Sequence, residues 1–353
     1  MKPANIYYYA NQIYQSGHAL PLYKAMGGIF ILKKIKRVFE FKKYTSEIPL
    51  YHNEKSLLNT PRFIVKNIDK VTDLEGVIIS LSNTAISCDP GICKTIYIGH
   101  GMGDKKFGEK NTNNQLEKYD YHFISGPKHL EKLKDSGAQI PDSKFIKIGN
   151  LGFDEYVDRK DDRDSIFQQR GISEPQRKNI LFAPTWEWGG GTLQKYVYDF
   201  ATELTKDFNL IVRPHSHDRK YIPKIKSWAK REGINNIYFS DSTNLIKYSI
   251  MDDFLISDLM ISDTSSILYE YLITKKPIII VKNDSNDLHH MPDDMNIIKY
   301  ASVYNKSTTI LSLLSENLFG SSTENHYAEL LNNCFYFNDG KSVQRAMEFI
   351  NSL

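Results

Sequence analysis

The stretch SDLMISDTSSILYEYLITKKPIIIV covers residues 257–281 and places a polar turn between two apolar runs. The runs 258–262 and 277–281 are short, which is typical of buried strands. Between them, residues 265–274 carry apolar side chains at helical spacing. A strand, a helix and a second strand in this order form the repeating unit of a parallel sheet. The stretch therefore predicts a doubly wound α/β domain.

The same alternation extends along the chain in both directions. In the second half, apolar runs predict further strands at 179–184, 209–214 and 236–240, and helical spacing predicts helices at 193–206, 219–232 and 243–252. In the first half we expect strands at 76–81, 94–99, 121–126 and 144–149, and a helix at 128–137. A last helix is expected at 341–353, and the polar stretch 158–165 is typical of a linker. The sequence thus predicts two Rossmann-like domains, 1–165 and 166–353, facing a cleft where the carboxyl ends of their strands meet.

Composition excludes several classes of protein. The chain has 45 Lys and Arg against 42 Asp and Glu, and a net charge of +3 is too small to indicate nucleic-acid binding. No apolar run reaches the roughly 18 residues of a membrane-spanning helix, and the first residues lack the apolar core of a signal peptide. Three cysteines without CxxC spacing argue against a zinc ribbon or a disulfide framework. We expect a cytoplasmic protein.

The polar turn has two interpretations. Asp263, Thr264, Ser265 and Ser266 are all residues that commonly cap helices. The same hydroxyls and the exposed N–H groups of a helix start also bind phosphate. The position at a strand-to-helix turn of a doubly wound sheet favours phosphate, and Glu270, further along the helix, is placed to accept hydrogen bonds from a ribose diol.

A histidine between glycines follows the strand at 94–99. Gly99 and Gly101 allow the backbone to turn sharply around His100 and bring the imidazole close to a ligand. An imidazole with a pKa of about 6.5 is suited to take a proton from a hydroxyl near neutral pH. Lys105 could neutralise phosphate charge nearby.

Two further segments follow strands in the same way. RPHSH at 213–217 offers the Arg213 fork for a phosphate and His215 as a donor to an oxygen carrying charge. The His-x-His spacing also suits a metal, but no acidic or cysteine partner stands nearby at the spacing of metal ligands, so we expect none. APTW, with Thr185, precedes a glycine-rich turn that matches neither a dinucleotide nor a Walker motif. Together the four segments predict one interdomain site for a nucleotide-diphosphate substrate, with no cofactor.

These motifs resemble those of the CDP-glycerol glycerophosphotransferases, the teichoic-acid primase and polymerase type. ISDTSSILYEYLITKKPIII is similar to the family's ISDYSS…KPII block, HGMGDK to its HGTPLK block, APTW to its APTW block and RPHS to its RxHP block. The resemblance spans roughly residues 95–285 in the right order. It implies a glycosyltransferase type B fold, with an acceptor-side first domain and a nucleotide-donor-binding second domain.

The resemblance also implies roles for individual residues. His100 falls where the family places its general base, and His215 falls on a second histidine that acts on the phosphate. Thr264, Ser265 and Ser266 fall on the pyrophosphate-binding turn. Gly99 stands where the family usually has Trp, and Thr264 where it has Tyr, so the residues around the transferred group differ.

The implied reaction is transfer of an alcohol phosphate, such as glycerol phosphate, from a CDP-activated donor to a hydroxyl of a glycan or lipid-linked acceptor. CMP would leave, and the product would be a cell-surface polymer such as teichoic acid or capsule. Two alternatives stay open: a glycosyltransferase of the same fold that uses a sugar nucleotide, and a non-catalytic nucleotide- or glycan-binding protein.

The segment IFILKKIKRVFEFKKY at 29–44 is basic and aromatic. It is either a buried strand at 29–32 followed by a solvated charged segment, or a patch that meets anionic lipid at the inner face of the membrane.

Overall fold

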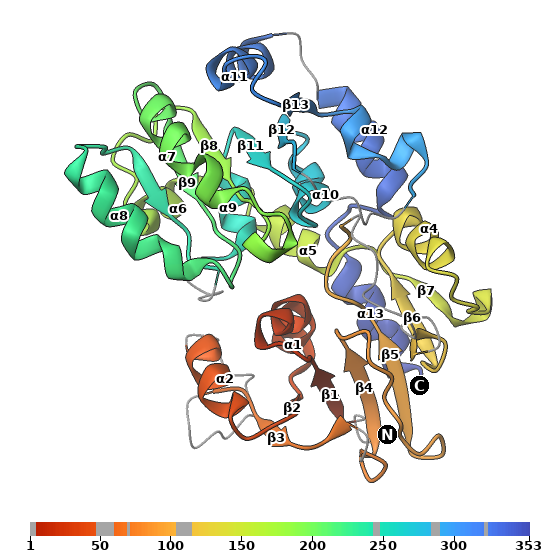
Figure 1. Ribbon diagram of the computed structural model, residues 1–353. Coiled ribbons are helices and arrows are strands. Elements are labelled where there is room, and N and C mark those ends of the chain that lie inside the picture. The colour runs from red at the N-terminus through yellow and green to blue at the C-terminus, as the bar shows by residue number, and fades with distance from the viewer. Residues whose placement is uncertain are drawn as a thin grey trace. The chain divides into compact units, whose positions relative to one another are not determined.

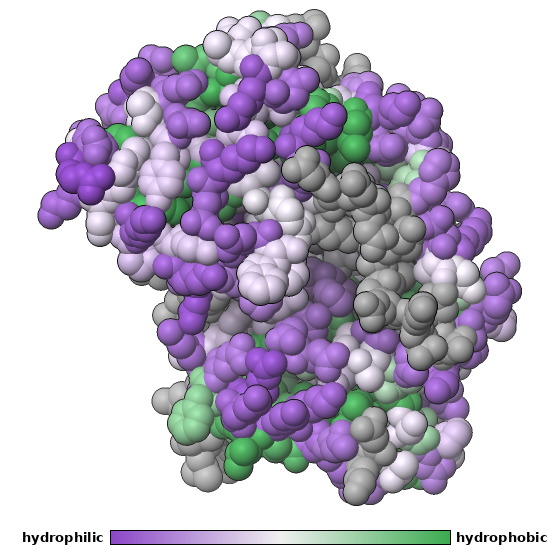
Figure 2. Space-filling model, in the orientation of Figure 1, coloured by the Kyte–Doolittle hydropathy of each residue, from purple (hydrophilic) through white to green (hydrophobic). Residues whose placement is uncertain are grey.

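A computed structural model describes residues 5–46, 60–68, 71–103, 115–242, 248–283, 290–320 and 324–353. The chain forms two compact units (Figure 1). Unit 1 comprises Met1–Gly101, Lys106–Val157 and Phe335–Leu353, and unit 2 comprises Met102–Lys105 and Asp158–Cys334. Each unit is built on one sheet whose strands all run parallel. Hydrophilic residues dominate the visible face of both units (Figure 2).

Unit 1 has a seven-stranded sheet in the order β3-β2-β1-β4-β5-β6-β7. Its strands are β1 (Ile6–Tyr9), β2 (Ile29–Leu32), β3 (Phe63–Val65), β4 (Gly76–Ser80), β5 (Cys93–Tyr97), β6 (Tyr121–Ile124) and β7 (Phe145–Lys147). Its helices are α1 (Leu20–Met26), α2 (Arg37–Thr45), α4 (Pro127–Asp135), α5 (Leu151–Asp158, of which Asp158 counts with unit 2) and α13 (Ser342–Asn351).

Unit 2 has a six-stranded sheet in the order β10-β9-β8-β11-β12-β13. Its strands are β8 (Asn179–Phe182), β9 (Asn209–Val212), β10 (Ile237–Phe239), β11 (Leu259–Ser262), β12 (Ile278–Val281) and β13 (Ser302–Tyr304). Its helices are α6 (Arg163–Arg170), α7 (Leu193–Leu204), α8 (Ile222–Arg231), α9 (Ile250–Ile256), α10 (Ile267–Glu270), α11 (Ile310–Phe319) and α12 (Glu324–Cys334).

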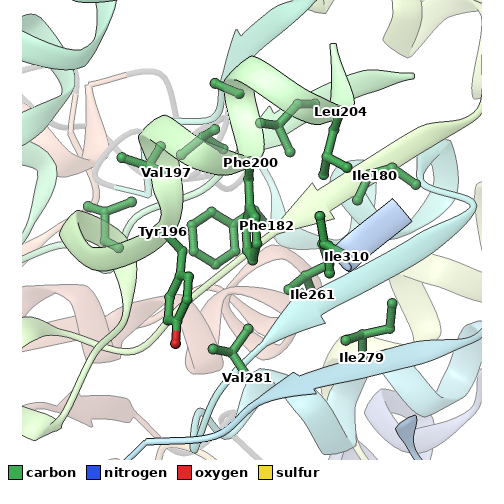
Figure 3. Close-up of a cluster of buried hydrophobic side chains, with 14 of the residues drawn as sticks. Ile180, Phe182, Tyr196, Val197, Phe200, Leu204, Ile261, Ile279, Val281 and Ile310 are labelled. Atoms are coloured by element: carbon green, nitrogen blue, oxygen red, sulfur yellow. The ribbon is translucent and has the colours of Figure 1, made fainter. Parts of the chain in front are cut away.

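The core of unit 2 explains why its strands are nearly continuous apolar runs. Every residue of β8, β9, β11 and β12 is buried, as in sheets covered by helices on both faces. Phe182 packs edge-to-face on Phe200 of α7, with ring centres 5.2 Å apart, within a cluster that includes Ile261 and Ile279 (Figure 3). Burial of each such side chain contributes about 2 kcal/mol. This core holds the strand ends, and therefore the loops that follow them, in fixed positions.

Within the described residues, all nine strands expected from the apolar runs are present. The sequence did not predict the strands β1, β3 and β13. The basic segment at 29–44 begins as the first of its two interpretations expected: β2 occupies 29–32 and is followed by exposed Lys33 and Lys34.

Three helices differ from their expected extents. In place of 243–252, α9 begins at Ile250, because the Ser249 hydroxyl accepts a hydrogen bond from the Met251 N–H at 3.2 Å and caps it there; residues 243–247 lie outside the described ranges. In place of 265–274, α10 has one turn and continues as a 3-10 helix at 271–274, ending at Lys275 in the left-handed region. Residues 219–221 form a 3-10 turn before α8.

The segment Phe335–Leu353 belongs to unit 1 although it follows unit 2 in sequence. Its helix α13 is capped by Asp154, whose carboxylate accepts the N–H groups of Ser342 and Val343 at 3.0 and 2.7 Å. Phe349 packs edge-to-face on Tyr121, with ring centres 4.9 Å apart. This grouping differs from the two consecutive domains expected with a boundary at residue 165, because contacts with residues far earlier in the chain determine where the segment lies.

No helix in the described parts of the chain combines the length and apolarity needed to cross a membrane.

Candidate functional site

The strand order of each unit indicates where a sheet of this kind would bind a ligand. In unit 2, β8 and β11 are neighbours, and the chain winds outward from them in opposite directions. Open α/β sheets bind ligands outside the carboxyl ends of the strands at such a point. The loop after β8 contains Thr185, and the turn after β11 is Asp263–Ser266. Two of the segments selected from the sequence therefore meet at this position.

Asp263 holds the two loops together. Its side chain is fully buried, and one oxygen accepts the Thr185 N–H at 2.8 Å. The other oxygen accepts the Thr192 N–H and hydroxyl, at 3.1 and 2.9 Å. Three hydrogen bonds from within the protein thus fall on this carboxylate, which the sequence analysis expected to touch substrate. The geometry favours a positioning role for Asp263 and does not make it the cap of its own helix.

Asn283, which the sequence analysis did not select, links a third loop to the same place. Its amide donates to the Gly190 carbonyl at 2.9 Å and to the Thr264 hydroxyl at 3.1 Å. Gly191 is required beside them, because a Cβ there would lie 2.1 Å from the Thr185 carbonyl oxygen. The loops after β8, β11 and β12 therefore form one connected surface.

Ser265 and Ser266 complete this surface. Both are partly buried, and their hydroxyls form no hydrogen bond with any described residue. Gly103, which groups with unit 2, lies against them: a Cβ on Gly103 would be 3.0 Å from the Ser266 N atom. These hydroxyls are available as donors to an oxyanion.

Arg213 is tied into a buried ionic network at the end of β9. Its Nη1 donates to Asp253, the Ser240 hydroxyl and the Tyr248 carbonyl at 2.7–2.8 Å. Asp253, which is fully buried, also lies 3.1 Å from an Arg170 nitrogen. A buried pair of this kind is costly to break from one side. The contacts on Nη1 hold the loop after β9 in place, and Nε and Nη2 of Arg213 form no hydrogen bond with any described residue.

His215 lies two residues after Arg213 and is oriented by its own loop. Its Nδ1 accepts the His217 N–H at 3.3 Å, so in the neutral ring the proton is on Nε2. The ring also packs against Trp186, with centres 6.3 Å apart. An Nε2–H is a hydrogen-bond donor, which suits an imidazole that contacts phosphate.

Glu270 is the last residue of α10 and is partly buried. Loss of hydration raises its pKa to about 7, and the positive charge of Arg213 acts in the opposite direction. The carboxyl group therefore changes its charge close to neutral pH.

In unit 1, His100 is fixed in the tautomer of a base. Its Nδ1 lies 2.6 Å from the Leu81 carbonyl oxygen, which only accepts, so Nδ1 carries the proton and Nε2 has the lone pair. Burial lowers the pKa of His100. The hydrogen bond to Leu81 acts in the opposite direction, and the positive charge of Lys132 adds a smaller lowering. Gly99 and Gly101 flank it with φ of 69° and 130°, values that favour glycine. The ring is thus neutral and able to accept a proton near pH 7.

Two neighbours of His100 were not found from the sequence. His18 follows β1 and its side chain is exposed, and its pKa is lowered by the surrounding protein and by the charge of His100. Lys132 on α4 is buried and acts electrostatically on His100. Both are far from His100 in sequence and lie outside any motif. Lys105 lies outside the described residues.

The described residues contain no group of three or more His, Cys, Asp or Glu side chains arranged to hold a metal ion.

Comparison with known proteins matches this chain to one family. The family described as CDP-Glycerol:Poly(glycerophosphate) glycerophosphotransferase matches residues 10–352. A teichoic acid glycerol-phosphate primase of Bacillus subtilis is 26% identical over 289 residues, covering 74% of this chain and 68% of the primase. A teichoic acid poly(glycerol phosphate) polymerase of Staphylococcus epidermidis is 27% identical over 179 residues, covering 48% of this chain and only 23% of the polymerase.

Solved structures agree on the fold. The wall teichoic acid polymerase TagF, soaked with CDPG, superposes with a TM-score of 0.67 at 18% identity, covering 100% of this chain and 89% of that one. A co-structure of S. aureus MnaA with UDP has a TM-score of 0.57 at 13% identity, covering 98% and 96%. The α/β class and the glycosyltransferase type B fold expected from the sequence are confirmed, and so is the expectation of an enzyme. With its family match extending over almost the whole sequence, the chain belongs to the CDP-glycerol:poly(glycerophosphate) glycerophosphotransferases.

Proposed function

We propose that this transferase moves glycerol phosphate from CDP-glycerol to a hydroxyl of a glycan or lipid-linked acceptor in teichoic-acid or related polymer synthesis, with release of CMP. Within the family, the observation that carries the proposal is the tautomer of His100: Nδ1 donates to Leu81, so Nε2 is left as a proton acceptor. A binding protein would not need an imidazole fixed and neutral in this way.

In the proposed reaction, His100 Nε2 takes the proton of the acceptor hydroxyl as the oxygen attacks the β-phosphorus of the donor. The bond from that phosphorus to the bridging oxygen breaks, and CMP leaves with the electron pair. Gly101 gives the acceptor close access to the base, and Lys105 balances charge on the donor.

Unit 2 would hold the leaving nucleotide. The hydroxyls of Thr264, Ser265 and Ser266 and the Nε2–H of His215 donate to phosphate oxygens, where charge builds up as the bond breaks. Thr185 lines the same surface, Glu270 accepts from the ribose, and the remaining nitrogens of Arg213 face the phosphates. Gly103, three residues after His100 in the sequence, lies against Ser266 within unit 2.

The test is a donor panel with the purified protein: CDP-glycerol, CDP-ribitol, UDP-sugars and CMP-sugars, with each released nucleotide identified by mass spectrometry. We expect CMP from CDP-glycerol only when an acceptor is added. CDP-ribitol is included because a teichoic acid ribitol-phosphate primase of Bacillus spizizenii is 24% identical over 72% of this chain. Release of UDP from a sugar nucleotide would replace the proposal with a glycosyltransferase.

We also propose that α2 and the turn before it make a peripheral contact with the inner face of the membrane. Ile35 and Phe39 are 77% and 80% exposed, and Lys33, Lys34 and Lys36 surround them. Protruding apolar side chains among cations are typical of interfacial anchors, and each cation near an anionic surface contributes about 1 kcal/mol.

Co-sedimentation with phosphatidylglycerol vesicles at low salt tests this contact. The variant I35S/F39S should bind at least about fivefold more weakly than the unmodified protein. The matched control is F319S, which removes another ring that is 65% exposed but has no such cluster of cations beside it. Equal binding by all three proteins would disprove the contact.

A further inference from the structure

A dense run of positive charge in unit 2 begins two residues after His217 and continues along α8. Residues 219–231, RKYIPKIKSWAKR, contain six Lys and Arg and no Asp or Glu, in a chain whose net charge is only +3. Most of this stretch forms α8. Ile225 and Ala229 are buried against the sheet, and the cations occupy the other faces of the helix.

Part of this charged surface is hollowed into a groove. A groove of about 430 Å³ lies between α7 and α8, lined by Tyr198, Lys224, Ser227, Trp228 and Arg231. Tyr198 and Trp228 pack edge-to-face with ring centres 4.8 Å apart, and both rings rest on the core of unit 2. The groove therefore has a rigid aromatic wall.

The cations of the groove are spaced along the helix. Lys224, Trp228 and Arg231 stand at positions i, i+4 and i+7, which places them on one face. At 1.5 Å per residue, Lys224 and Arg231 are about 10 Å apart along the axis, with the indole ring between them. A polymer whose negative charges alternate with uncharged carbon segments matches this order of cation, aromatic ring and cation.

The protein's own acids do not neutralise the groove. Lys224 forms no ion pair with any described residue. Among the described residues, Arg231 pairs with Glu232 at 3.1 Å, and both side chains are exposed, so the pair is weak.

We infer that this α7–α8 groove binds a polyol-phosphate chain, with phosphates on Lys224 and Arg231 and the carbon backbone against Trp228. The inference rests on the proposed function, because such a chain is what the enzyme would extend. The groove would hold a part of the acceptor remote from the reacting hydroxyl. A bilayer fits less well, since Trp228 is partly buried in a concave wall, in contrast to Phe39, which protrudes at 80% exposure.

The test uses a defined glycerol-phosphate oligomer as the probe, with calorimetric titration of the full chain. The variant K224E/R231E should bind the oligomer at least about tenfold more weakly than the unmodified protein, because two attractive contacts become repulsive. The matched control is K195E/K230E, which makes the same change of charge at exposed positions outside the groove, one on α7 and one on α8. The control should stay within about twofold, apart from a general effect of net charge that falls with salt.

Turnover provides the second readout. For K224E/R231E we expect KM to rise for long acceptors, while CMP release with a single-unit acceptor stays unchanged. Equal loss of binding in both double variants, or no loss in either, would overturn the inference. So would loss of binding to phosphatidylglycerol vesicles in K224E/R231E with oligomer binding intact, which would identify a bilayer as the partner. If the unmodified protein releases no CMP from any CDP-alcohol, the proposed function fails, whereas normal release with unaltered groove variants refutes the groove alone.

Discussion

The two units place different chemical groups around their sheets. In unit 1, the imidazoles of His100, His122 and His129 are kept from charging, because desolvation lowers their pKa. Beyond the strands of unit 2 lie hydroxyls, an arginine held in an ion pair and a carboxylate that holds two loops together. One unit keeps bases neutral, and the other arranges hydrogen-bond donors.

The difference bears on the roles that we propose for His100 and Asp263. Nδ1 of His100 contacts the Leu81 carbonyl oxygen, and the Nε2 lone pair forms no hydrogen bond with any described residue. Asp263 uses both oxygens within the protein. Substitutions in the two units should therefore affect different quantities.

Replacement of His100 should have the largest effect. H100A removes the proton acceptor, so we expect kcat for CMP release to fall by about 10²–10⁴-fold. Affinity for the CDP donor, measured by calorimetry, should change by less than about twofold, because we propose that unit 2 holds the donor's phosphates. H326A on α12 controls for loss of a histidine elsewhere, and unchanged turnover in H100A would show that another group is the base.

Replacement of Asp263 should reduce stability and donor affinity together. In D263N an amide replaces a carboxylate that accepts three hydrogen bonds, so the free energy of unfolding should fall by about 2–4 kcal/mol. With the loops after β8 and β11 released, donor affinity should fall about tenfold or more.

Asp258 offers a matched control at the other end of the same strand. It accepts the Asn179 N–H at 2.8 Å and pairs with Arg163. D258N should lower stability, measured by urea unfolding, without a comparable loss of donor affinity. If both variants lose affinity to the same extent, the hydrogen bonds from Asp263 to the two loops have no special role in donor binding.

Acid should destabilise unit 1 through its buried imidazoles. The pKa is lowered from 6.5 to about 4 at His122 and about 3 at His129, chiefly by desolvation. The unfolded chain therefore binds protons that the folded chain does not, and stability falls as the pH drops from 6.5 towards 4. Each imidazole accounts for about 3 kcal/mol over this window. In H122F the ring stays among Tyr97 and Phe145, and thermal unfolding between pH 4 and 7 should show a shallower slope. An unchanged slope would mean that His122 is not the group responsible.

The smallest effect is expected at Glu270. Its pKa of about 7 means that the carboxyl is mostly protonated at pH 6 and mostly ionised at pH 8. Because an ionised carboxylate accepts more strongly from a ribose diol, CMP affinity should rise about threefold over that range. E270Q should remove the pH dependence, and a variant that keeps it would assign the titration to another group.

Much of the fold was predictable because its strands are buried on both faces. Ile278–Val281 is apolar throughout and Asn179–Phe182 is apolar after its first residue, and such runs identify strands of a parallel sheet. The strands that were missed carry a weaker signal. β3 and β13 are edge strands of three residues each and are not fully buried. β1 reads IYYY, so three of its four residues are tyrosines and not aliphatic side chains.

The candidate site was predictable only as loops. Motifs after strands located His100 and the turn at Asp263 correctly at strand ends. They could not reveal that Asp263 would bond to Thr192, 71 residues away, or that Arg213 would pair with Asp253, 40 residues away. Partners at such separations are determined by the order of strands in the sheet, which one sequence does not encode locally.

The return of Phe335–Leu353 to unit 1 affects the order in which the two units can fold during synthesis. The ribosome completes Asp158–Cys334 before it begins this segment, which takes roughly 9–35 s at about 5–20 residues per second. During that interval Asp154 has no helix to cap, and Tyr121 and Phe123 lack the ring of Phe349. Unit 2 can pack its core during synthesis, whereas unit 1, which contains His100, cannot complete its packing until Phe335–Leu353 has been made. The nascent enzyme would then bind its nucleotide before it can use it, and chaperones would meet the exposed side of unit 1.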